Sequence, residues 1–395
     1  MKRFFSYIIL SFFLLLLPTG QASANNNDSI RLSLLTCAPG EEIYSLFGHT
    51  AIRYENPSQG IDVVFNYGLF SFNTPNFIFR FSLGETDYQL GATDYERFAA
   101  EYAFFGRSVW QQTLNLTDEE KTELIRLLQE NYRPENRVYR YNFFYDNCAT
   151  RPRDKIEESI AGKVIYPAEP QDGSLTFRDI VHQYCKGHPW ARFGIDLCIG
   201  SEADQPITQR QMMFAPFYLM DAFDGAQIKG DSIQRPLITA NELVVDATPE
   251  PDESDWMPTP LQCSLLLFIL TAAATIYGIR RRTGLWGIDL FLFGIAGIVG
   301  CVLAFLALFS QHPAVSSNFL LLVFHPGQLL FLPYIIYCVR KGKKCWYLTL
   351  NLAVLTLFIV LFPVIPQRFD FAVVPLALCL LIRSVSNLIV TSKKK

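Results

Sequence analysis

The chain has 395 residues, of which 50% are apolar, 14% aromatic and only 18% charged. This composition excludes a single ordinary soluble domain, and the length indicates two or three structural units. The net charge of -3 gives no support to nucleic-acid binding. The apolar excess is concentrated at the N-terminus and in the last third of the chain.

Residues 1–24 have the three parts of a secretory signal peptide. Lys2 and Arg3 form the basic start, an apolar stretch follows over 4–17, and Ala22-Ser23-Ala24 fits a small-residue cleavage site. An uncleaved anchor is the alternative, but the apolar stretch is short for a full span. We therefore expect the region that follows, residues 25–245, to be exported.

The patterns within this region predict a domain of mixed α and β structure. Residues that alternate in polarity predict four strands, the middle two of which form a hairpin: 30–36, 50–54, 61–67 and 108–116. Helical spacing predicts three helices: 95–105, 119–132 and 149–160. A capping box begins at Thr117, and Asp146 or Asn147 would cap the last helix, with Pro152 in its first turn.

The rest of the chain predicts a membrane domain. An acidic, proline-containing stretch over 246–260 has the composition of a linker. Residues 261–392 then contain five apolar runs, each about long enough to cross a bilayer: 261–279, 286–309, 319–339, 346–362 and 371–390.

Basic clusters predict the orientation of these runs. They follow the first run at Arg280-Arg281-Arg282, separate the third and fourth runs over 340–344, and end the chain at Lys393-Lys394-Lys395. Because basic loops stay in the cytoplasm, the first run leads from outside to inside. Residues 25–260 would then lie outside, as the signal peptide also requires.

Cys148 is the first candidate for chemistry. It directly precedes the predicted helix 149–160, where unpaired backbone N–H groups and the positive end of the helix dipole favour a thiolate. Such a thiolate is a nucleophile for acyl chemistry, and the same N–H groups could stabilise an oxyanion. The competing interpretation is a buried structural cysteine, which is the commoner fate of a lone cysteine.

His49 is the second candidate, although a strand histidine is more often a packed structural residue. If Tyr54 pairs with Ile61 across the hairpin turn, the same register sets His49 opposite Asn66. An amide there could hold the imidazole tautomer, as the third member of a catalytic triad does. Asp62 is the alternative orienting residue, and a one-residue shift of the register would separate His49 from Asn66.

The segments around these candidates resemble a known family. Phe47-Gly-His-Thr-Ala-Ile-Arg53, Phe65-Asn-Tyr-Gly68 and Tyr141-Asn-Phe-Phe-Tyr-Asp-Asn-Cys-Ala-Thr-Arg-Pro-Arg-Asp154 are similar to the periplasmic domain of the Lnb family of bacterial lipoprotein N-acyltransferases. A strand histidine followed much later by Asn-Cys at a helix start also resembles the circularly permuted papain-like fold of NlpC-like enzymes and lecithin:retinol acyltransferase relatives. The resemblance covers most of residues 30–245, and the multi-span C-terminal region fits it.

The resemblance implies an α+β, papain-like periplasmic domain joined to a multi-pass domain of the bacterial cytoplasmic membrane. It implies a thiol acyltransferase without a cofactor, in which Cys148 takes an acyl chain from a phospholipid as a thioester. The acceptor would be the α-amine of a diacylglyceryl lipoprotein. His49 would serve as base and acid, with Asn66 as its orienting residue. The motif does not fix the third member, and family membership does not itself identify the acceptor.

The predicted spans agree with a lipid substrate on physical grounds. A domain tethered by a short linker to five spans is held at the membrane surface, which raises its effective concentration for lipids. A wall-cleaving peptidase would need only one anchor. Arg151 and Arg153, beside the thiol, could bind a lipid phosphate. Alternatively they are helix-surface charges paired with Glu157 and Glu158.

Several further residues are candidates for metal binding or disulfide formation. His182 and His188 flank Cys185, but no second cluster completes a metal site, so we expect no metal. Cys185 and Cys198 could form a disulfide in an oxidising compartment.

Residues 209–225 are rich in Met and Phe and could form core or an acyl groove. His312, Asn318 and His325 lie at or within the outer end of the membrane region and are candidates for lipid binding rather than catalysis.

Three functions compete at this point. The first is lipoprotein N-acylation, the second is a papain-like hydrolase of cell-wall peptides or phospholipids, and the third is a nonenzymatic membrane module. The intact pair of Cys148 and His49 argues against the third. The acyl acceptor, an amine or water, distinguishes the first two.

Overall fold

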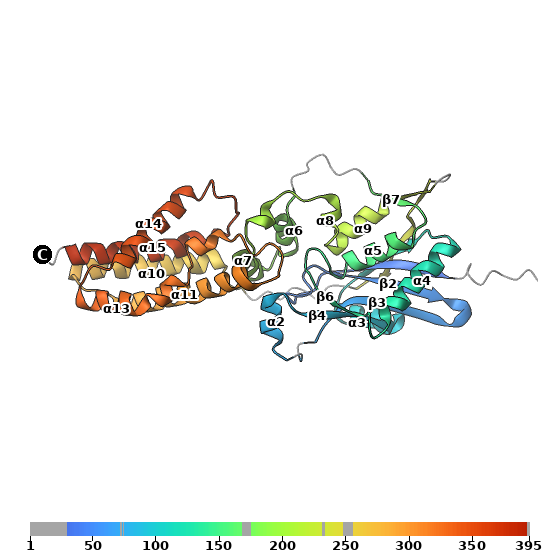
Figure 1. Cartoon of the computed structure of the whole chain (residues 1–395), viewed down its shortest axis with the longest axis horizontal. Helices are drawn as coiled ribbons and strands as arrows, with labels where there is room; N and C mark the ends of the chain where they lie inside the picture. The colour runs from blue at the N-terminus through green and yellow to red at the C-terminus, as the bar shows by residue number, and fades with distance from the viewer. Residues whose placement is uncertain are drawn as a thin grey trace, which may run out of the picture.

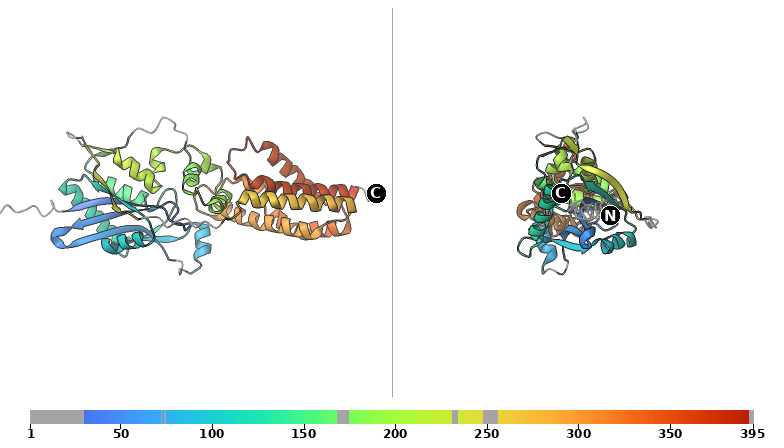
Figure 2. Two further views of the ribbon diagram at one scale, coloured as in Figure 1. Left: turned by 180° about the vertical axis from the view of Figure 1, so that it is seen from behind. Right: turned by 90° about the vertical axis from the view of Figure 1, so that its right-hand side faces the viewer.

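The computed structural model describes residues 30–71, 73, 75–167, 175–230, 234–247 and 256–392. The predicted signal peptide and residues 248–255 of the predicted linker lie outside the described residues. The described chain forms an elongated molecule in which a mixed α and β part and a bundle of apolar helices lie end to end (Figures 1 and 2).

The N-terminal part is built on a seven-stranded sheet in which all neighbouring strands are antiparallel. Its strands are β1 (Arg31–Cys37), β2 (His49–Asn56), β3 (Ile61–Leu69), β4 (Asp87–Asp94), β5 (Val109–Leu114), β6 (Val138–Arg140) and β10 (Ile238–Val245). Their order across the sheet is β10-β5-β1-β2-β3-β4-β6. A separate small sheet has the order β7 (Lys163–Ile165), β8 (Gln227–Lys229) and β9 (Gln234–Pro236).

Helices cover both faces of the large sheet. Because successive strand residues point to opposite faces, Leu34 and Leu35 of β1 pack into different buried clusters. The Leu35 cluster includes side chains of α3, and the Leu34 cluster includes side chains of α4, α5 and α9. These helices are α3 (Tyr95–Phe104), α4 (Asp118–Tyr132), α5 (Thr150–Ser159) and α9 (Pro216–Asp224).

A third layer lies between the sheet and the helix bundle (Figure 1). It contains the short elements α6 (Phe177–Tyr184), α7 (Pro189–Cys198), η3 (Ser201–Asp204) and α8 (Gln209–Met212). Their cluster of buried residues centres on Phe47, Phe144, Phe177 and Phe214. This layer brings the sheet and the bundle into contact.

The local patterns of the sequence are largely confirmed. The predicted strands and helices are present with shifts of one or two residues at their ends, and the capping box at Thr117 forms, with its hydroxyl accepting from the Glu120 amide. The predicted hairpin register is wrong by two residues. Asn56 pairs with Ile61, so Tyr54 pairs with Val63, because the turn is a short 3₁₀ segment at Pro57–Gln59.

The C-terminal part contains helices at all five apolar runs. Three are long and apolar enough to cross a membrane: α10 (Pro260–Arg281), α11 (Trp286–Phe309) and α15 (Val373–Ser392). The third run is broken, with η4 (Phe319–Leu322) and α12 (Gly327–Leu330) bent by 73° from α13 (Leu332–Lys341). If this bent pair is one span, the described residues contain four, and α14 (Trp346–Leu361), with 16 residues, is shorter.

The first two basic clusters lie at the far end of the bundle, and Lys393-Lys394-Lys395 lie outside the described residues. Arg282 ends α10, and the guanidinium of Arg340 at the end of α13 lies 5.4 Å from the ring of Trp286, which begins α11. The opposite end of α11, around Phe309, faces the N-terminal part (Figure 1). This arrangement agrees with the predicted orientation, in which the basic loops are cytoplasmic.

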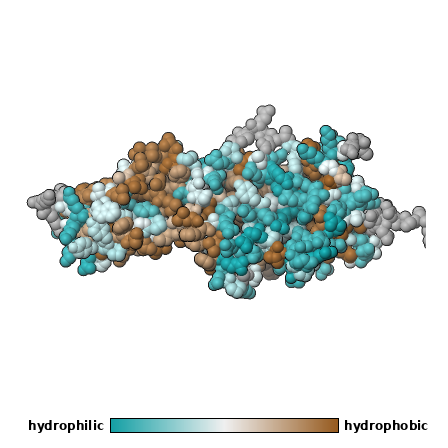
Figure 3. Space-filling view, in the orientation of Figure 1, coloured by the Kyte–Doolittle hydropathy of each residue, from teal (hydrophilic) through white to brown (hydrophobic). Residues whose placement is uncertain are grey.

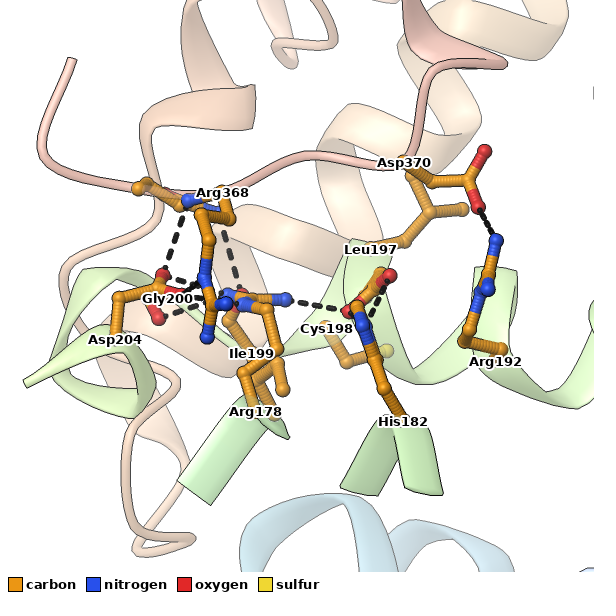
Figure 4. A network of polar contacts seen from close by, with 12 residues as sticks. Arg178, His182, Arg192, Leu197, Cys198, Ile199, Gly200, Asp204, Arg368 and Asp370 are labelled. Atoms are coloured by element: carbon orange, nitrogen blue, oxygen red, sulfur yellow. Dashed lines mark hydrogen bonds and ion pairs between the residues drawn. The ribbon is translucent and has the colours of Figure 1, made fainter. Parts of the chain in front are cut away.

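A polar network joins the third layer to the loop between α14 and α15 (Figure 4). Arg178 of α6 is fully buried and donates to Asp196 at 2.6 Å and Asp204 at 2.8 Å. Arg368 of the α14–α15 loop donates to the same Asp204 at 3.0 Å and to Asp179 at 2.6 Å. One carboxylate therefore binds arginines from both parts of the chain.

Neutral contacts extend this network. The amide of Asn318, between α11 and η4, donates to the carbonyl of Leu197 at 2.7 Å. The side chain of Gln367 donates to Ile199 O at 3.2 Å, and Phe193 and Leu197 of α7 pack against the bundle core. The junction thus combines buried charge, backbone hydrogen bonds and apolar packing, which fixes the space between the two parts.

Replacing Arg178 with alanine should strongly destabilise the N-terminal part. Asp196 and Asp204 would lose their buried partner, which typically costs about 3–5 kcal/mol. Urea titration of the detergent-solubilised protein, followed by circular dichroism, measures this loss. Arg126→Ala is the control, because the Arg126 pair with Glu123 is exposed and should contribute nothing measurable. Equal midpoints for the two variants would contradict the role of Arg178.

Candidate active site

His49 is placed by the glycine before it. Gly48 has a φ of +77°, and a Cβ at this position would lie 2.5 Å from the carbonyl oxygen of Cys37. A glycine is therefore required for the chain to turn into β2 here. The turn sets His49 opposite Cys37, at the end of the sheet that approaches the helix bundle.

Asn66 contacts His49, as the sequence predicts, but by a different register. The Oδ1 atom of Asn66 lies 2.5 Å from Nε2 of His49. Continuing the observed pairing of Ile52 with Phe65 places Asn66 opposite Ala51, diagonal to His49. The predicted register is wrong by two residues, and side chains along a strand alternate between the two faces of the sheet. Asn66 therefore stays on the same face of the sheet as His49.

This contact selects a tautomer of the imidazole. A carbonyl oxygen can only accept, so Nε2 donates to Asn66 and Nδ1 keeps its lone pair. Asp62, the alternative orienting residue, is not available for this role. Both of its carboxylate oxygens bind Arg53, at 2.8 Å each.

Cys148 lies in the turn that leads into α5. The Oδ1 atom of Asn147 accepts from the amides of Ala149 and Thr150, at 2.8 and 3.0 Å. Its Nδ2 donates to the carbonyls of Phe143 and Phe214. Asn147, one of the two predicted caps, thus holds the turn before the helix. The N-cap itself is Ala149, which makes no side-chain capping hydrogen bond, and the helix begins at Thr150 rather than at 149.

Cys148 and His49 come together at Gly68 of β3. Gly68 has a φ of +91°, and a Cβ there would lie 3.5 Å from Cys148 Cβ and 3.9 Å from His49 Cε1. The backbone amides of Thr50 and Cys148 hydrogen-bond to the thiol sulfur. Residues from β2, β3 and the turn before α5 therefore form one cluster.

Both titratable groups of the cluster are neutral at pH 7. Burial raises the pKa of Cys148 to about 11, although the amides of Thr50 and Cys148 act in the opposite direction. Burial also lowers the pKa of His49 to about 4, although the hydrogen bond that His49 donates to Asn66 acts in the opposite direction. The predicted thiolate is therefore wrong, because desolvation outweighs the local N–H groups.

The cluster opens into an apolar cavity of about 380 Å³ between the two parts of the chain. Its volume lies within the range of small-molecule sites, about 300–1,000 Å³. Aromatic side chains of the N-terminal part form much of the wall: Tyr44, Phe47, Phe70, Phe81, Tyr88, Tyr141, Phe143, Phe144 and Phe214. The bundle completes it with Leu306, His312, Pro313 and Val315.

Arg151 and Arg153 do not line this cavity. Arg151 binds both carboxylate oxygens of Asp146, at 2.6 and 2.7 Å. Arg153 is buried and donates to Asp154 and to the carbonyl of Arg210. Their positions do not support the predicted contact with a lipid phosphate, nor do they show the alternative pairing with Glu157 and Glu158.

The other predicted ligands are accounted for within the fold. His182 binds Asp196 at 2.9 Å, and no group of His, Cys, Asp and Glu that could hold a metal occurs among the described residues. Cys185 and Cys198 are free thiols, so the suggested disulfide is not formed.

The three candidate residues at the outer end of the membrane region have different surroundings. Of His312, Asn318 and His325, His312 lines the cavity, whereas Asn318 donates to the carbonyl of Leu197 and the ring of His325 lies 6.1 Å from that of Tyr347. Within residues 209–225, Phe214 lies both in the core and in the cavity wall.

Tyr139 of β6 is a residue that the sequence did not single out. It is 7% exposed, and its hydroxyl has no hydrogen-bond partner among the described atoms. The hydroxyl would lie 4.0 Å from a Cβ on Gly68, which is the position between Cys148 and His49. A lone tyrosine in a three-residue strand carries no sequence signal, so only the fold brings it to the cluster.

The fold and the cavity define the chain as an integral membrane protein whose extramembrane domain meets the helix bundle at an apolar cavity. Two family models match it. The Lnb N-terminal periplasmic domain matches residues 20–182, and the Lnb transmembrane domain matches residues 252–395. The chain belongs to the Lnb family, membrane-associated enzymes that modify lipoproteins, with an N-terminal domain in the periplasm.

The family resemblance seen in the sequence is thereby confirmed. No curated protein and no solved structure matches the chain. The papain-like topology therefore stays a prediction.

The high pKa of Cys148 predicts a characteristic alkylation profile. Iodoacetamide should modify Cys148 slowly at pH 7, with a rate that rises about tenfold per pH unit toward pH 11, because only the thiolate reacts. Peptide mass spectrometry measures this rate, and Cys148→Ser identifies the peptide. A plateau of reactivity between pH 5 and 8 would instead indicate a preformed thiolate–imidazolium pair.

Proposed function

We propose that the protein is a thiol acyltransferase that moves an acyl chain from a phospholipid to the α-amine of a diacylated lipoprotein. The observation that supports this most is that Cys148 lines an apolar cavity walled by both the periplasmic domain and the membrane helices. A peptide substrate in water would not need this wall. An acyl chain from the adjoining bilayer would fit it.

The first half-reaction forms a thioester. As the Cys148 sulfur attacks the ester carbonyl carbon, Nδ1 of His49 accepts the thiol proton. The tetrahedral intermediate then collapses, and the imidazolium gives the same proton to the departing oxygen of the lysophospholipid. Because thiol and imidazole begin neutral, charge develops only during the attack, and Asn66 keeps the ring oriented for both transfers.

The developing oxyanion has two candidate donors. The backbone amide of Cys148 lies beside the sulfur, and the unpaired hydroxyl of Tyr139 lies on the Gly68 side of the cluster. Donors fixed before the reaction stabilise the intermediate without reorganisation.

The second half-reaction regenerates the thiol. The lipoprotein amine attacks the thioester carbonyl, His49 takes a proton from the amine, and the thiolate leaves and recovers that proton from the imidazolium. The product is an amide. The apolar walls disfavour water as a competing acceptor.

The runner-up function, a papain-like hydrolase, uses the same thioester but transfers the chain to water. Cell-wall peptides fit the apolar lining poorly, so a phospholipase is the stronger form of this alternative.

Trapping of the thioester tests the first half-reaction. In phosphatidylethanolamine vesicles, wild-type protein should gain the mass of one acyl chain, which neutral hydroxylamine removes. Cys148→Ser should show no hydroxylamine-sensitive adduct. His49→Ala should slow acylation by about 10²- to 10⁴-fold, because the general base is lost.

Addition of a diacylglyceryl-cysteine peptide tests the acceptor. The thioester should discharge to an N-acylated peptide, and a peptide with a blocked α-amine is the control. Release of free fatty acid at the same rate with either peptide would identify a phospholipase and contradict the transferase.

Tyr139→Phe separates a catalytic hydroxyl from a structural one. Because the hydroxyl is buried without a partner, its removal should leave stability unchanged or slightly higher. Loss of an oxyanion donor should lower the acylation rate by about 10²- to 10³-fold. Thermal unfolding and the vesicle acylation assay measure the two effects. An unchanged acylation rate would exclude Tyr139 as an oxyanion donor.

A further inference from the structure

The short helix α2 (Phe77–Leu83) of the periplasmic domain carries an unusually apolar exposed surface. Its sequence is FIFRFSL, and it has no buried residue. Ile78 is 79% exposed, Phe79 59% and Phe81 46%. Contiguous apolar side chains of this kind on a domain surface generally mark a contact with a partner or a membrane.

The position of α2 along the bundle identifies what it meets. Its last residue, Leu83, accepts a backbone hydrogen bond from Gln311 at 2.8 Å, and the Phe81 carbonyl lies 2.6 Å from Nε2 of His312. The ring centroid of Phe79 lies 5.9 Å from that of Phe305 in α11. Because α11 is long enough to span a membrane and ends at Phe309, α2 lies at the level of its last turn.

The figures show the same arrangement. In both side views α2 lies at the junction, next to the end of α11 (Figures 1 and 2). In the space-filling view the hydrophobic surface of the bundle reaches the place of α2 (Figure 3). On α11 this surface includes Leu308, 75% exposed, and Phe309, 65% exposed. The exposed side of α2 is therefore continuous with the lipid-facing surface of the spans.

The charge of α2 does not oppose this placement. Arg80 donates to Asp87 at 2.9 Å and to the Glu85 carbonyl at 3.0 Å, so its guanidinium binds back to the periplasmic domain. A helix with apolar side chains outward and its cation paired behind it suits the boundary between headgroups and acyl chains.

The same two elements also form the wall of the cavity. Phe81 of α2, Leu306 of α11 and His312 line it, and the ring centroid of His312 lies 5.2 Å from that of Phe81. Ile78 and Leu308 of these elements are 79% and 75% exposed and do not line the cavity. Lipid on one side and the cavity that holds Cys148 on the other are thus separated by α2 packed against the end of α11.

We propose that α2 inserts into the outer leaflet of the membrane, and that the seam between α2 and α11 is the portal through which a phospholipid acyl chain passes from the bilayer to Cys148. The second half of this statement rests on the proposed acyltransferase function. The insertion of α2 does not, so the two are tested separately.

Fluorescence quenching tests the insertion. Ile78→Trp and Ile165→Trp each add a tryptophan to the five native ones. Ile165 is 39% exposed in β7, far from the bundle (Figure 1). In vesicles of phosphatidylcholine brominated along its acyl chains, the added emission at position 78 should be quenched and that at 165 should not. Equal emission in brominated and unbrominated vesicles at position 78 would overturn the insertion, as would protection of position 78 by a second copy of the chain, detected by cross-linking.

Two acyl donors test the portal. Ile78→Asp should slow acylation of Cys148 from phosphatidylethanolamine vesicles by about tenfold or more, because a charge replaces an apolar group in lipid. Its reaction with p-nitrophenyl butyrate, which reaches the cavity from water, should stay at the wild-type rate. Ile165→Asp, the matched control, should change neither rate.

Each outcome of this comparison either supports or overturns the proposed portal. A wild-type rate of Ile78→Asp with vesicles would overturn it while leaving the acyltransferase function standing. An equal loss of rate with both acyl donors would place the effect at the cavity around Cys148 rather than at lipid access. This result would also overturn the portal. If the wild-type protein itself forms no thioester from vesicles, the proposed function fails together with the portal, and the quenching result still decides the insertion.

Discussion

The structure depends on the buried junction between α6–α7 and the outer loops of the membrane helices. Asp204 binds Arg178 from one side and Arg368 from the other, and Arg178 is fully buried. Separating the buried guanidinium from its carboxylates would leave unpaired buried charges at a high cost in free energy. The two parts are therefore held in one arrangement. The cavity exists only because this arrangement is fixed, since its walls come from both parts.

Desolvation controls the chemistry that this cavity can support. The same burial that makes the cavity suitable for an acyl chain raises the pKa of Cys148 and lowers that of His49. The pair therefore rests as neutral thiol and neutral base rather than as an ion pair. A neutral resting state suits an apolar cavity, where a standing charge would be costly. The contact with Asn66 leaves the free lone pair of the His49 ring on Nδ1.

The sequence predicted part of this site for reasons that can be stated. Asn66 was found because strand periodicity is two, so a register error of two residues still kept it on the face of His49. The thiolate was predicted wrongly because a helix terminus is a local feature, whereas burial depends on residues such as Phe214 and Leu306 that are distant in sequence. Arg151 binds Asp146 rather than Glu157 or Glu158, because the turn before α5 brings that carboxylate next to the guanidinium.

The sequence by itself determined the apolar runs, their orientation, the family and the pair of Cys148 and His49, because these depend on composition, period and local motif. Tertiary structure alone decided that Tyr139 reaches the pair and that α2 lies against the end of α11. It also decided that the thiol opens toward the membrane helices. These features depend on contacts between segments far apart in the chain. A pattern within one segment does not encode how that segment packs against a distant one.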